Sequence, residues 1–241
     1  MASTVWLSLI LPAYNEVGRI RETIAEAKAY LDRRGYPCEI IVAADGGDGT
    51  REAVAELARS DPRLKVTGSV ERRGKGHGVR QAVQLAAGEV VGFADADNKT
   101  PIDDFEKVRP LLLEGWDVVI GSRALADSRI ERPQPLYRRL GSRGFHVLMR
   151  TVVGLSGITD TQCGFKFFRR DVALDLFRRQ RIDGYMFDVE ILYLARRAGY
   201  RIAQVPVRWR DDGDSRLALL SGNFRNVVDL FRIRFSGAGS R

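Results

Sequence analysis

Short aliphatic runs alternate with helical patterns through the first half of the chain. The runs are continuous and rich in β-branched residues, which is typical of strands buried on both faces of a parallel sheet. They cover residues 5–11, 38–44, 64–68, 89–94 and 117–121. After the first run, apolar residues recur at helical spacing at Ile20, Ile24, Ala27 and Leu31. This alternation predicts a doubly wound α/β sheet, which binds ligands beyond the carboxyl ends of its strands.

The second half of the chain is less regular. Residues 123–137 contain Pro133 and Pro135 among mixed charges and predict a loop, whereas residues 138–153 predict a basic amphipathic helix. A helix is expected over residues 184–198 and a strand over 202–207. A last helix is expected over residues 217–235, with one apolar face made of Leu220, Phe224, Val227, Val228, Phe231 and Phe235. We therefore divide the chain into a main domain, residues 1–216, and a basic amphipathic helix and tail, residues 217–241.

Composition narrows the class of protein. The chain has 241 residues, of which 44% are hydrophobic and 29% charged, and this excludes a disordered, collagen-like or disulfide-stapled protein. Cys38 and Cys163 are far apart in the sequence and predict free thiols in a reducing compartment. No stretch approaches the roughly 18 consecutive apolar residues of a membrane-spanning helix, and no secretory signal is visible, so we expect a cytosolic protein.

The net charge of +8 is concentrated in two segments. Residues 123–150 contain seven arginines against two acidic residues, and residues 216–241 contain five arginines against Asp229. Such clusters fit a nucleic-acid binder, a protein of the membrane surface or an enzyme that binds phosphates.

Three acidic, turn-forming segments follow predicted strands: Pro12–Glu16, Asp45–Thr50 and Asp95–Asp97. Because residues two apart in an extended chain point to the same side, the carboxylates of Asp95 and Asp97 would converge. Paired carboxylates at a strand end are hard oxygen ligands for Mg²⁺ or Mn²⁺. A simple turn at Asp97-Asn98 is the alternative, but three such segments at one edge of the sheet favour a metal.

Other polar residues at this edge suit a nucleotide. Asp45 could accept hydrogen bonds from a base or ribose, Tyr14 could stack on a base, and Glu16 could bind the nucleotide or cap the following helix. For Asp48 and Thr50 we expect only turn and capping roles.

A glycine-rich basic segment, residues 72–78, precedes a predicted helix, and its backbone N–H groups could bind phosphate. It lacks the Walker A order, and no G-x-G-x-x-G follows the first strand, which counts against an NAD site. His77 alone is a poor catalytic candidate. The arginines of residues 123–150 could bind phosphate through two N–H groups of each planar guanidinium. Alternatively, they form only the solvent-exposed face of a helix.

Taken together, these motifs resemble the family 2 glycosyltransferases, whose GT-A fold is a Rossmann-like, mostly parallel sheet flanked by helices. More narrowly, the chain resembles the polyprenyl-phosphate hexosyltransferases, which comprise dolichyl-phosphate mannose synthases and dolichyl-phosphate β-glucosyltransferases. The resemblance runs from about residue 7 to 233. Pro12–Glu16 and the D-x-D of Asp95 and Asp97 are shared widely, whereas three segments resemble the glucosyltransferase branch: Asp160–Lys166, Phe187–Glu190 and Trp209–Leu217.

The resemblance implies a role for particular residues. Those expected to bind the nucleotide sugar, with Lys75 added from the glycine-rich segment, are Pro12, Tyr14, Glu16, Ala43, Asp45, Lys75, Asp95, Ala96, Asp97, Arg210 and Arg216. Asp95 and Asp97 would hold Mg²⁺ or Mn²⁺, and the acceptor phosphate would be held by Arg123, Arg138 and Ser142. We take Asp95, Asp97, Arg123 and Arg138 as the catalytic residues.

The chain also departs from the family pattern. Ala44-Asp45 replaces a pair of aspartates, and Arg216 replaces a lysine. Lys99 stands where the mannose synthases have a glutamine metal ligand, which puts a third protein ligand in doubt and favours the glucosyl branch.

The resemblance implies an inverting transfer of a hexose, with glucose favoured, to a polyprenyl or dolichyl phosphate. UDP-glucose is the favoured donor and GDP-mannose the alternative, and the enzyme would be peripheral at the cytoplasmic face of a membrane. The helix expected at 138–153 and the last helix would lie in the membrane interface or, alternatively, pack against the sheet. Two other functions stay open: a glycosyltransferase with a soluble acceptor, and a non-catalytic nucleotide- or RNA-binding protein, although we expect no nucleic-acid partner.

Overall fold

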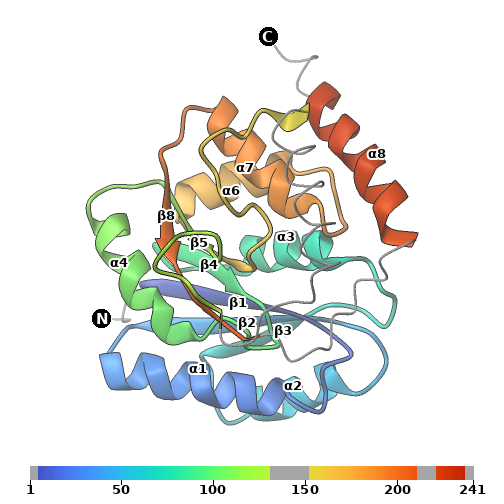
Figure 1. Cartoon of the computed structure of the whole chain (residues 1–241). Coiled ribbons are helices and arrows are strands. Elements are labelled where there is room, and N and C mark those ends of the chain that lie inside the picture. Colours follow the sequence, from blue (N-terminus) through green and yellow to red (C-terminus); the bar gives the residue numbers. More distant parts are fainter. Residues whose placement is uncertain (1–4, 131–151, 211–220, 237–241) are drawn as a thin grey trace.

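A seven-stranded sheet forms the centre of the molecule in the computed structural model, which describes residues 5–130, 152–210 and 221–236 (Figure 1). The strand order is β3-β2-β1-β4-β7-β5-β8. The strands are β1 Leu7–Tyr14, β2 Cys38–Asp45, β3 Leu64–Thr67, β4 Val90–Ala94, β5 Val118–Ser122, β7 Phe165–Arg169 and β8 Ile202–Pro206. A separate parallel pair is formed by β6, Arg129–Ile130, and β9, Arg208–Trp209. The expected α/β, mostly parallel architecture is confirmed.

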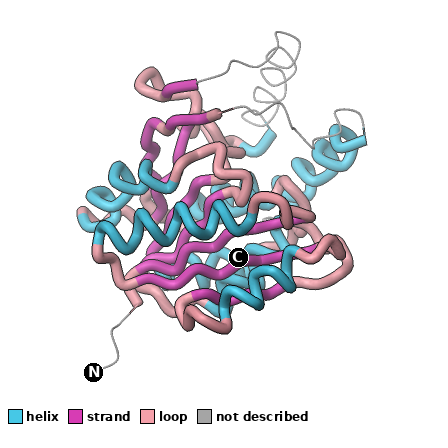
Figure 2. Tube along the Cα trace, turned by 90° about the horizontal axis from the view of Figure 1, so that it is seen from below, coloured by secondary structure: helices cyan, strands magenta, loops and turns pink. Residues whose placement is uncertain are grey.

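Helices cover both faces of the sheet, and Figure 2 shows them in front of and behind its strands. They are α1 Ile20–Arg34, α2 Thr50–Ala58, α3 Lys75–Leu85, α4 Phe105–Leu113, α6 Arg170–Arg179, α7 Phe187–Arg197 and α8 Ser221–Ser236, with a short 3₁₀ turn at Ile102–Asp104. Side chains alternate between the faces along each strand. Leu9 and Leu11 therefore join a core with α1 and α4, whereas Ile10 joins a second core with α3, α6 and α7.

The sequence pattern located the strands of the first half but missed β7, α4 and α6. β7 is antiparallel to both of its neighbours, β4 and β5. The chain leaves β5 at the carboxyl edge and comes back into the sheet at the same edge, where the Asp95 N–H donates to the Gly164 carbonyl at 3.0 Å. A strand that enters there must run against its neighbours, so the sheet cannot be wholly parallel.

Two predicted segments of the second half agree with the structure, and one lies mostly outside it. The helix expected at 184–198 is α7, and the strand expected at 202–207 is β8. The basic helix expected at 138–153 lies outside the described residues, apart from 152 and 153, which are helical. The loop expected at 123–137 is described only to residue 130 and carries the short strand β6.

The last helix is present as α8, and two residues of its predicted apolar face, Phe231 and Phe235, point away from the core. Leu230 and Ile233, which are 0% and 1% exposed, belong to the core shared with α6 and α7. Phe231 and Phe235 are 47% and 68% exposed. Leu220 and the side chain of Phe224 lie outside the described part. The helix therefore presents one apolar stripe to the core and a second to the surroundings. Within the described residues, no helix combines the length and hydropathy needed to cross a bilayer.

Candidate functional site

The carboxyl edge of the sheet brings together the three acidic segments picked out from the sequence. β1 and β2 run in parallel register, so that Tyr14 lies opposite Asp45 and Pro12 opposite Ala43. β4 pairs with the other side of β1, and Asp95 follows directly after it. The strand topology thus places residues from three different segments around one edge.

Asp95 is paired with Lys75 from the first turn of α3. The Lys75 Nζ atom is 2.6 Å from Asp95 Oδ1 and 3.9 Å from Asp188 Oδ2. Burial disfavours the charged amine, but these two carboxylates outweigh it and raise the pKa of Lys75. Lys75, predicted to bind the nucleotide sugar, is therefore a positively charged partner of the first D-x-D carboxylate.

Asp97 lies in a tight turn with a lysine of its own. The Lys99 N–H donates to Asp97 Oδ1 at 3.2 Å, and Lys99 Nζ is 3.6 Å from Asp97 Oδ2. Asn98 has a φ of 53°, and its N–H donates to the Asp95 carbonyl at 3.1 Å. The left-handed conformation suits asparagine better than most residues. The turn considered as an alternative to a metal site is thus present, and it is the turn that orients Asp97.

The two carboxylates fit a divalent cation as a pair of oxygen ligands. Burial raises the pKa of Asp97, and the negative charge of Asp95 raises it further, so the two carboxylates repel one another. A bound Mg²⁺ or Mn²⁺ would relieve that repulsion with the oxygen ligands it prefers. Across the described ranges, no cluster of three or more histidine, cysteine or acidic residues has the geometry of a metal site. In general, Mg²⁺ held by one or two carboxylates completes its coordination with water and the phosphates of a substrate.

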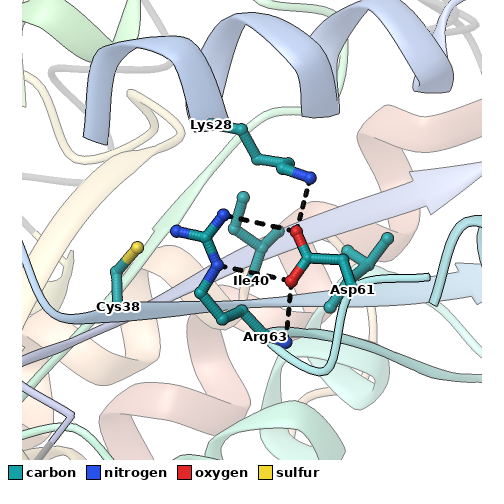
Figure 3. Close-up of a pocket in the computed structure, with 6 residues that line it drawn as sticks. Lys28, Cys38, Ile40, Asp61 and Arg63 are labelled. Atoms are coloured by element: carbon teal, nitrogen blue, oxygen red, sulfur yellow. Dashed lines mark hydrogen bonds and ion pairs between the residues drawn. The ribbon is translucent and has the colours of Figure 1, made fainter. Parts of the chain in front are cut away.

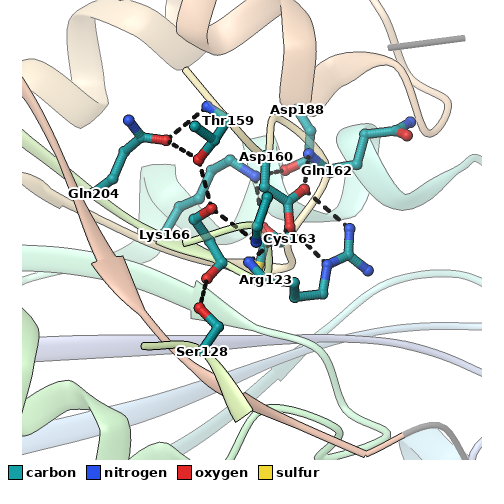
Figure 4. Close-up of polar contacts among 11 residues, drawn as sticks. Arg123, Ser128, Thr159, Asp160, Gln162, Cys163, Lys166, Asp188 and Gln204 are labelled. Carbon is teal, nitrogen blue, oxygen red and sulfur yellow. Dashed lines mark hydrogen bonds and ion pairs between the residues drawn. The ribbon is translucent and has the colours of Figure 1, made fainter. Parts of the chain in front are cut away.

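A buried charge network adjoins the Lys75–Asp95 pair, and Figure 4 shows two of its members, Lys166 and Asp188. Lys166 is 0% exposed, and its Nζ atom is 2.6 Å from Asp188 Oδ1 and 2.6 Å from the Cys163 carbonyl oxygen. Asp188 is itself buried and lies between Lys166 and Lys75. Our site assignment gave these two residues no role. The sequence did contain a signal for both residues, since each is a charged residue within a short apolar run. Charged residues in buried segments are rarely found without a paired partner, so each run pointed to a buried ion pair.

Arg123, the proposed acceptor arginine, is held by Asp160 (Figure 4). Its Nε and Nη2 atoms lie 2.6 Å and 3.0 Å from the two Asp160 oxygens, and its backbone N–H donates to the same carboxylate at 3.1 Å. Burial opposes ionisation of Asp160, but the guanidinium lowers the pKa of this carboxyl to about 2. The guanidinium also lies 5.4 Å from the ring centroid of Trp209. Asp160 occupies the Nε and Nη2 atoms of the Arg123 guanidinium, so a phosphate would bind on the side of the guanidinium that carries Nη1.

The residues expected to bind the base form a closed group around Tyr14. The Arg72 guanidinium lies 4.4 Å above the Tyr14 ring, and its Nη2 atom is 3.4 Å from the Tyr185 hydroxyl. Asp45 accepts the backbone N–H groups of Ser69 at 3.2 Å and Arg73 at 2.9 Å. Asp45 therefore shapes the loop that carries Arg72, and a base that stacks on the face of Tyr14 covered by Arg72 must displace that guanidinium.

Glu16, Asp48 and Thr50 link the β1 and β2 loops. Glu16 pairs with Arg19 at 2.8 Å, and its backbone N–H donates to the Thr50 hydroxyl at 2.9 Å. Asp48 accepts the backbone N–H groups of Thr50 and Val17, each at 3.0 Å. These contacts match the turn role expected for Asp48 and Thr50.

The glycine-rich segment packs closely on the loop before α7. A Cβ atom at Gly74 would lie 2.3 Å from the Asp183 carbonyl oxygen, and one at Gly76 would lie 2.6 Å from that of Ile182. The His77 N–H donates to the Asp183 carbonyl at 3.2 Å. The glycines therefore permit close backbone packing, and the His77 N–H is not free to bind phosphate.

The remaining predicted residues are placed only in part. Ala43 packs near Gly78, the Ala96 carbonyl accepts a hydrogen bond from Thr23 at 2.8 Å, and the N–H of exposed Arg210 donates to the Lys99 carbonyl at 3.0 Å. Three further predictions, Arg138, Ser142 and Arg216, lie outside the described residues.

A small pocket lies at the opposite edge of the sheet, between α1 and the first residues of β2 and β3 (Figure 3). Asp61 binds Lys28 and Arg63 there, with Arg63 Nε 3.3 Å from Asp61 Oδ1. Cys38 lines the pocket, and burial raises the pKa of its thiol. The amino ends of β2 and β3 meet here, so this ion-paired pocket is separate from the D-x-D edge.

Comparisons with known proteins agree with this geometry. Residues 8–177 match the family described as Glycosyl transferase family 2. The chain is 36% identical over 242 residues to a dolichyl-phosphate beta-glucosyltransferase of Trichomonas vaginalis, covering 96% of this chain and 71% of that protein. It is 34% identical over 246 residues to the dolichyl-phosphate beta-glucosyltransferase of Homo sapiens, covering 96% and 75% of the two proteins.

Solved structures share the fold at lower identity. A mannosyl-3-phosphoglycerate synthase from Rubrobacter xylanophilus has a TM-score of 0.69 at 21% identity, covering 98% of this chain and 76% of that one. A glucosyl-3-phosphoglycerate synthase from Mycobacterium tuberculosis, in complex with Mn²⁺, UDP-glucose and phosphoglyceric acid, has a TM-score of 0.67 at 22% identity, covering 95% and 79%.

Proposed function

Because the chain belongs to glycosyl transferase family 2, we propose that it transfers glucose from UDP-glucose to a dolichyl or polyprenyl phosphate. The observation that carries this proposal is the long match to relatives named dolichyl-phosphate beta-glucosyltransferase, at 34–36% identity over 96% of the chain. UDP as the nucleotide is supported by the structural neighbour that contains UDP-glucose. The same neighbour contains Mn²⁺, which supports a divalent ion at Asp95 and Asp97.

In this proposal the acceptor phosphate attacks the sugar directly. A phosphate monoester has a second pKa near ~6, so it is mostly a dianion at neutral pH and needs no dedicated base. The dianion and the donor diphosphate repel each other, and the site must offset that repulsion. Burial disfavours the charged guanidinium of Arg123, yet Asp160 and, more weakly, Asp95 raise its pKa, so it stays charged beside the D-x-D. Arg123 would orient the phosphate for in-line attack, which inverts the anomeric centre.

In this proposal the nucleotide-sugar donor is bound at the D-x-D of Asp95 and Asp97, which Lys75 and Lys99 contact. The divalent ion, when bound by Asp95 and Asp97, supplies positive charge for the leaving diphosphate. Lys75 and Lys99 each lie beside one of the two carboxylates, with Lys75 Nζ 2.6 Å from Asp95 Oδ1 and Lys99 Nζ 3.6 Å from Asp97 Oδ2, and they help to orient them. Tyr14 and Asp45 would bind the base and ribose, and Arg210 and Arg216 would close over the diphosphate.

We also propose that the enzyme works as a peripheral protein at the cytoplasmic face of a membrane. A polyprenyl chain stays in the bilayer, so its phosphate must be reached from the surface. Cys38 and Cys163 are both buried and free, which fits a reducing compartment.

A matrix of donors and acceptors tests the proposal. The purified protein is incubated with labelled UDP-glucose or GDP-mannose, with Mn²⁺ or Mg²⁺, and with polyprenyl phosphate, 3-phosphoglycerate or a free sugar. We expect a labelled glucolipid from UDP-glucose and polyprenyl phosphate alone. Transfer only to 3-phosphoglycerate or a sugar would replace this function by that of a transferase with a soluble acceptor.

A further inference from the structure

We propose that the outward stripe of α8 is a docking surface for an anionic lipid bilayer. The stripe consists of Val228, Phe231 and Phe235, with Arg232 and Arg234 on either side, and we call it the α8 stripe. The choice of a bilayer as the partner rests on the proposed lipid-phosphate acceptor. The exposure of the stripe is independent of that proposal.

The orientation of α8 is fixed by contacts on its opposite side. Asp229, Leu230 and Ile233 are buried, and the latter two lie in the core shared with α6 and α7. The Tyr193 hydroxyl of α7 donates to the Arg234 carbonyl at 3.4 Å. Figure 1 shows α8 alongside α7 at the rim of the helix layer. Because these contacts hold one side of the helix, the residues half a turn away must face outward.

Two phenylalanine rings stand on that outward side. Phe231 and Phe235 stack with their centroids 6.4 Å apart and their planes 11° from parallel. They are one helical turn apart, so they form a continuous apolar surface along the helix. Adjacent exposed aromatic side chains of this kind mark a surface that a partner covers.

The arginines that flank the stripe complement an anionic surface. Arg232 and Arg234 lie on opposite flanks of the stripe, and the Arg232 side chain is 68% exposed while still 3.2 Å from Asp229. Long arginine side chains can extend toward lipid phosphates while aromatic rings enter the acyl boundary. An apolar stripe between arginines is the pattern of a helix lying in the plane of an anionic membrane. A hydrophobic protein partner would not require cations on both flanks.

The position of α8 relates docking to the site. α8 packs on α7, and Asp188 in the first turn of α7 belongs to the network behind Asp95. Docking through the α8 stripe would hold this domain at the surface that contains the acceptor phosphates. It would raise the local concentration of acceptor without changing the chemistry of the site.

Vesicle binding tests the surface directly, without any turnover. Wild type, F231S/F235S and the control L85S/L113S are sedimented with vesicles of phosphatidylcholine alone or with phosphatidylglycerol added. Leu85 and Leu113 are a matched control, because they are 47% and 60% exposed on α3 and α4. We expect wild type and control to bind the anionic vesicles, and F231S/F235S to show at least about a tenfold lower partition coefficient. Equal binding by all three proteins, or equal loss in the control, would overturn the proposal.

A second pair of measurements separates this proposal from the proposed function. With a water-soluble, short-chain isoprenyl phosphate and no vesicles, F231S/F235S should transfer glucose within about twofold of wild type, whereas transfer to long-chain acceptor in vesicles should fall. Vesicle binding without any glucosyl transfer would contradict the function and leave the surface standing. Light scattering is the last check, because a wild-type dimer that F231S/F235S converts to a monomer would assign the stripe to a second copy of the chain.

Discussion

The carboxylate of Asp95 lies directly against the Cα atom of Gly164. A Cβ atom at residue 164 would lie 2.1 Å from Asp95 Oδ2 and 2.4 Å from Asp95 Oδ1. The two residues are also joined through the Asp95 N–H and the Gly164 carbonyl, at 3.0 Å. The glycine that precedes β7 therefore fixes where the first D-x-D carboxylate lies, which explains why a segment far from the D-x-D in sequence belongs to the site.

Gly164→Ala should displace Asp95 with only a limited effect on folding. The new methyl group must push the carboxylate away from Lys75 and Asp97, and a displacement of about 1 Å in a catalytic group costs about 100-fold in turnover. We expect that loss in glucosyl transfer, measured beside the thermal midpoint of unfolding. Gly184→Ala is the control, because nothing lies within 4 Å of a Cβ atom there. Near-normal turnover of Gly164→Ala would contradict the role of Asp95.

Lys166 and Asp188 should be strongly coupled in stability. Removal of either partner leaves a buried charge without its counter-charge at 2.6 Å, so Lys166→Met and Asp188→Leu should each cost about 3–5 kcal/mol of unfolding free energy. The double variant should cost clearly less than the sum, as urea unfolding of the four proteins would reveal. The exposed pair Arg169 and Asp171 provides a control cycle, in which we expect little coupling. Additive costs at 166 and 188 would refute the buried pair.

The pairing of Asp160 with Arg123 predicts a particular pH dependence of stability. The pKa of Asp160 falls from 3.8 to about 2 on folding, so this group stabilises the fold above pH 3.8 and loses that effect as the pH falls toward 2. The full contribution is about 2 kcal/mol, of which about half is lost by pH 3. Urea unfolding of wild type and Asp160→Asn should therefore differ by a constant amount from pH 7 to 5 and by about 1 kcal/mol less at pH 3. A gap that is unchanged at pH 3 would exclude this ion pair.

Arg72 and Tyr14 should affect nucleotide binding in opposite directions. A base that stacks on the face of Tyr14 covered by Arg72 must first displace the guanidinium, whose cation–π contact is worth about 0.5–1 kcal/mol at an exposed site. By calorimetry with UDP and Mn²⁺, Tyr14→Ala should bind about tenfold more weakly, because it loses base stacking. Arg72→Ala should bind as tightly as wild type or up to about fivefold more tightly. Equal weakening by the two variants would mean that Arg72 contacts the nucleotide itself.

Much of the fold could be predicted from the sequence because buried parallel strands are continuous aliphatic runs. β7 was missed because Phe165–Arg169 is aromatic and charged, and its antiparallel direction depends on where the chain re-enters the sheet. α4 was missed because Pro110 interrupts its pattern. For α8, periodicity predicted the helix but not its orientation, since Leu230 and Ile233 form a second apolar stripe that only packing against α6 and α7 identifies as the core face.

The site was predictable in its location and less so in its contacts. Strand ends predicted where Asp45, Asp95 and Asp97 would gather, and the family resemblance is confirmed by the comparisons. The partners of these residues come from distant segments. Arg123 and Asp160 are 37 positions apart, a separation that periodicity does not detect. Asp160, Lys166 and Asp188 lie within the motifs on which the family resemblance rests, but the motifs do not give their contacts. The structure shows that Asp160 binds Arg123 and that Asp188, paired with Lys166, contacts Lys75, which in turn binds Asp95.

The transfer of labelled glucose from UDP-glucose to polyprenyl phosphate, compared between wild type and Asp97→Ala, tests the central claim most directly. Asp97→Ala should lose at least about 100-fold in turnover and should no longer respond to Mn²⁺. Its far-ultraviolet circular dichroism and thermal midpoint should stay close to wild type, as should the activity of the exposed control Asp171→Ala. A glucolipid formed by Asp97→Ala at near-normal rate, with unchanged Mn²⁺ dependence, would contradict the account.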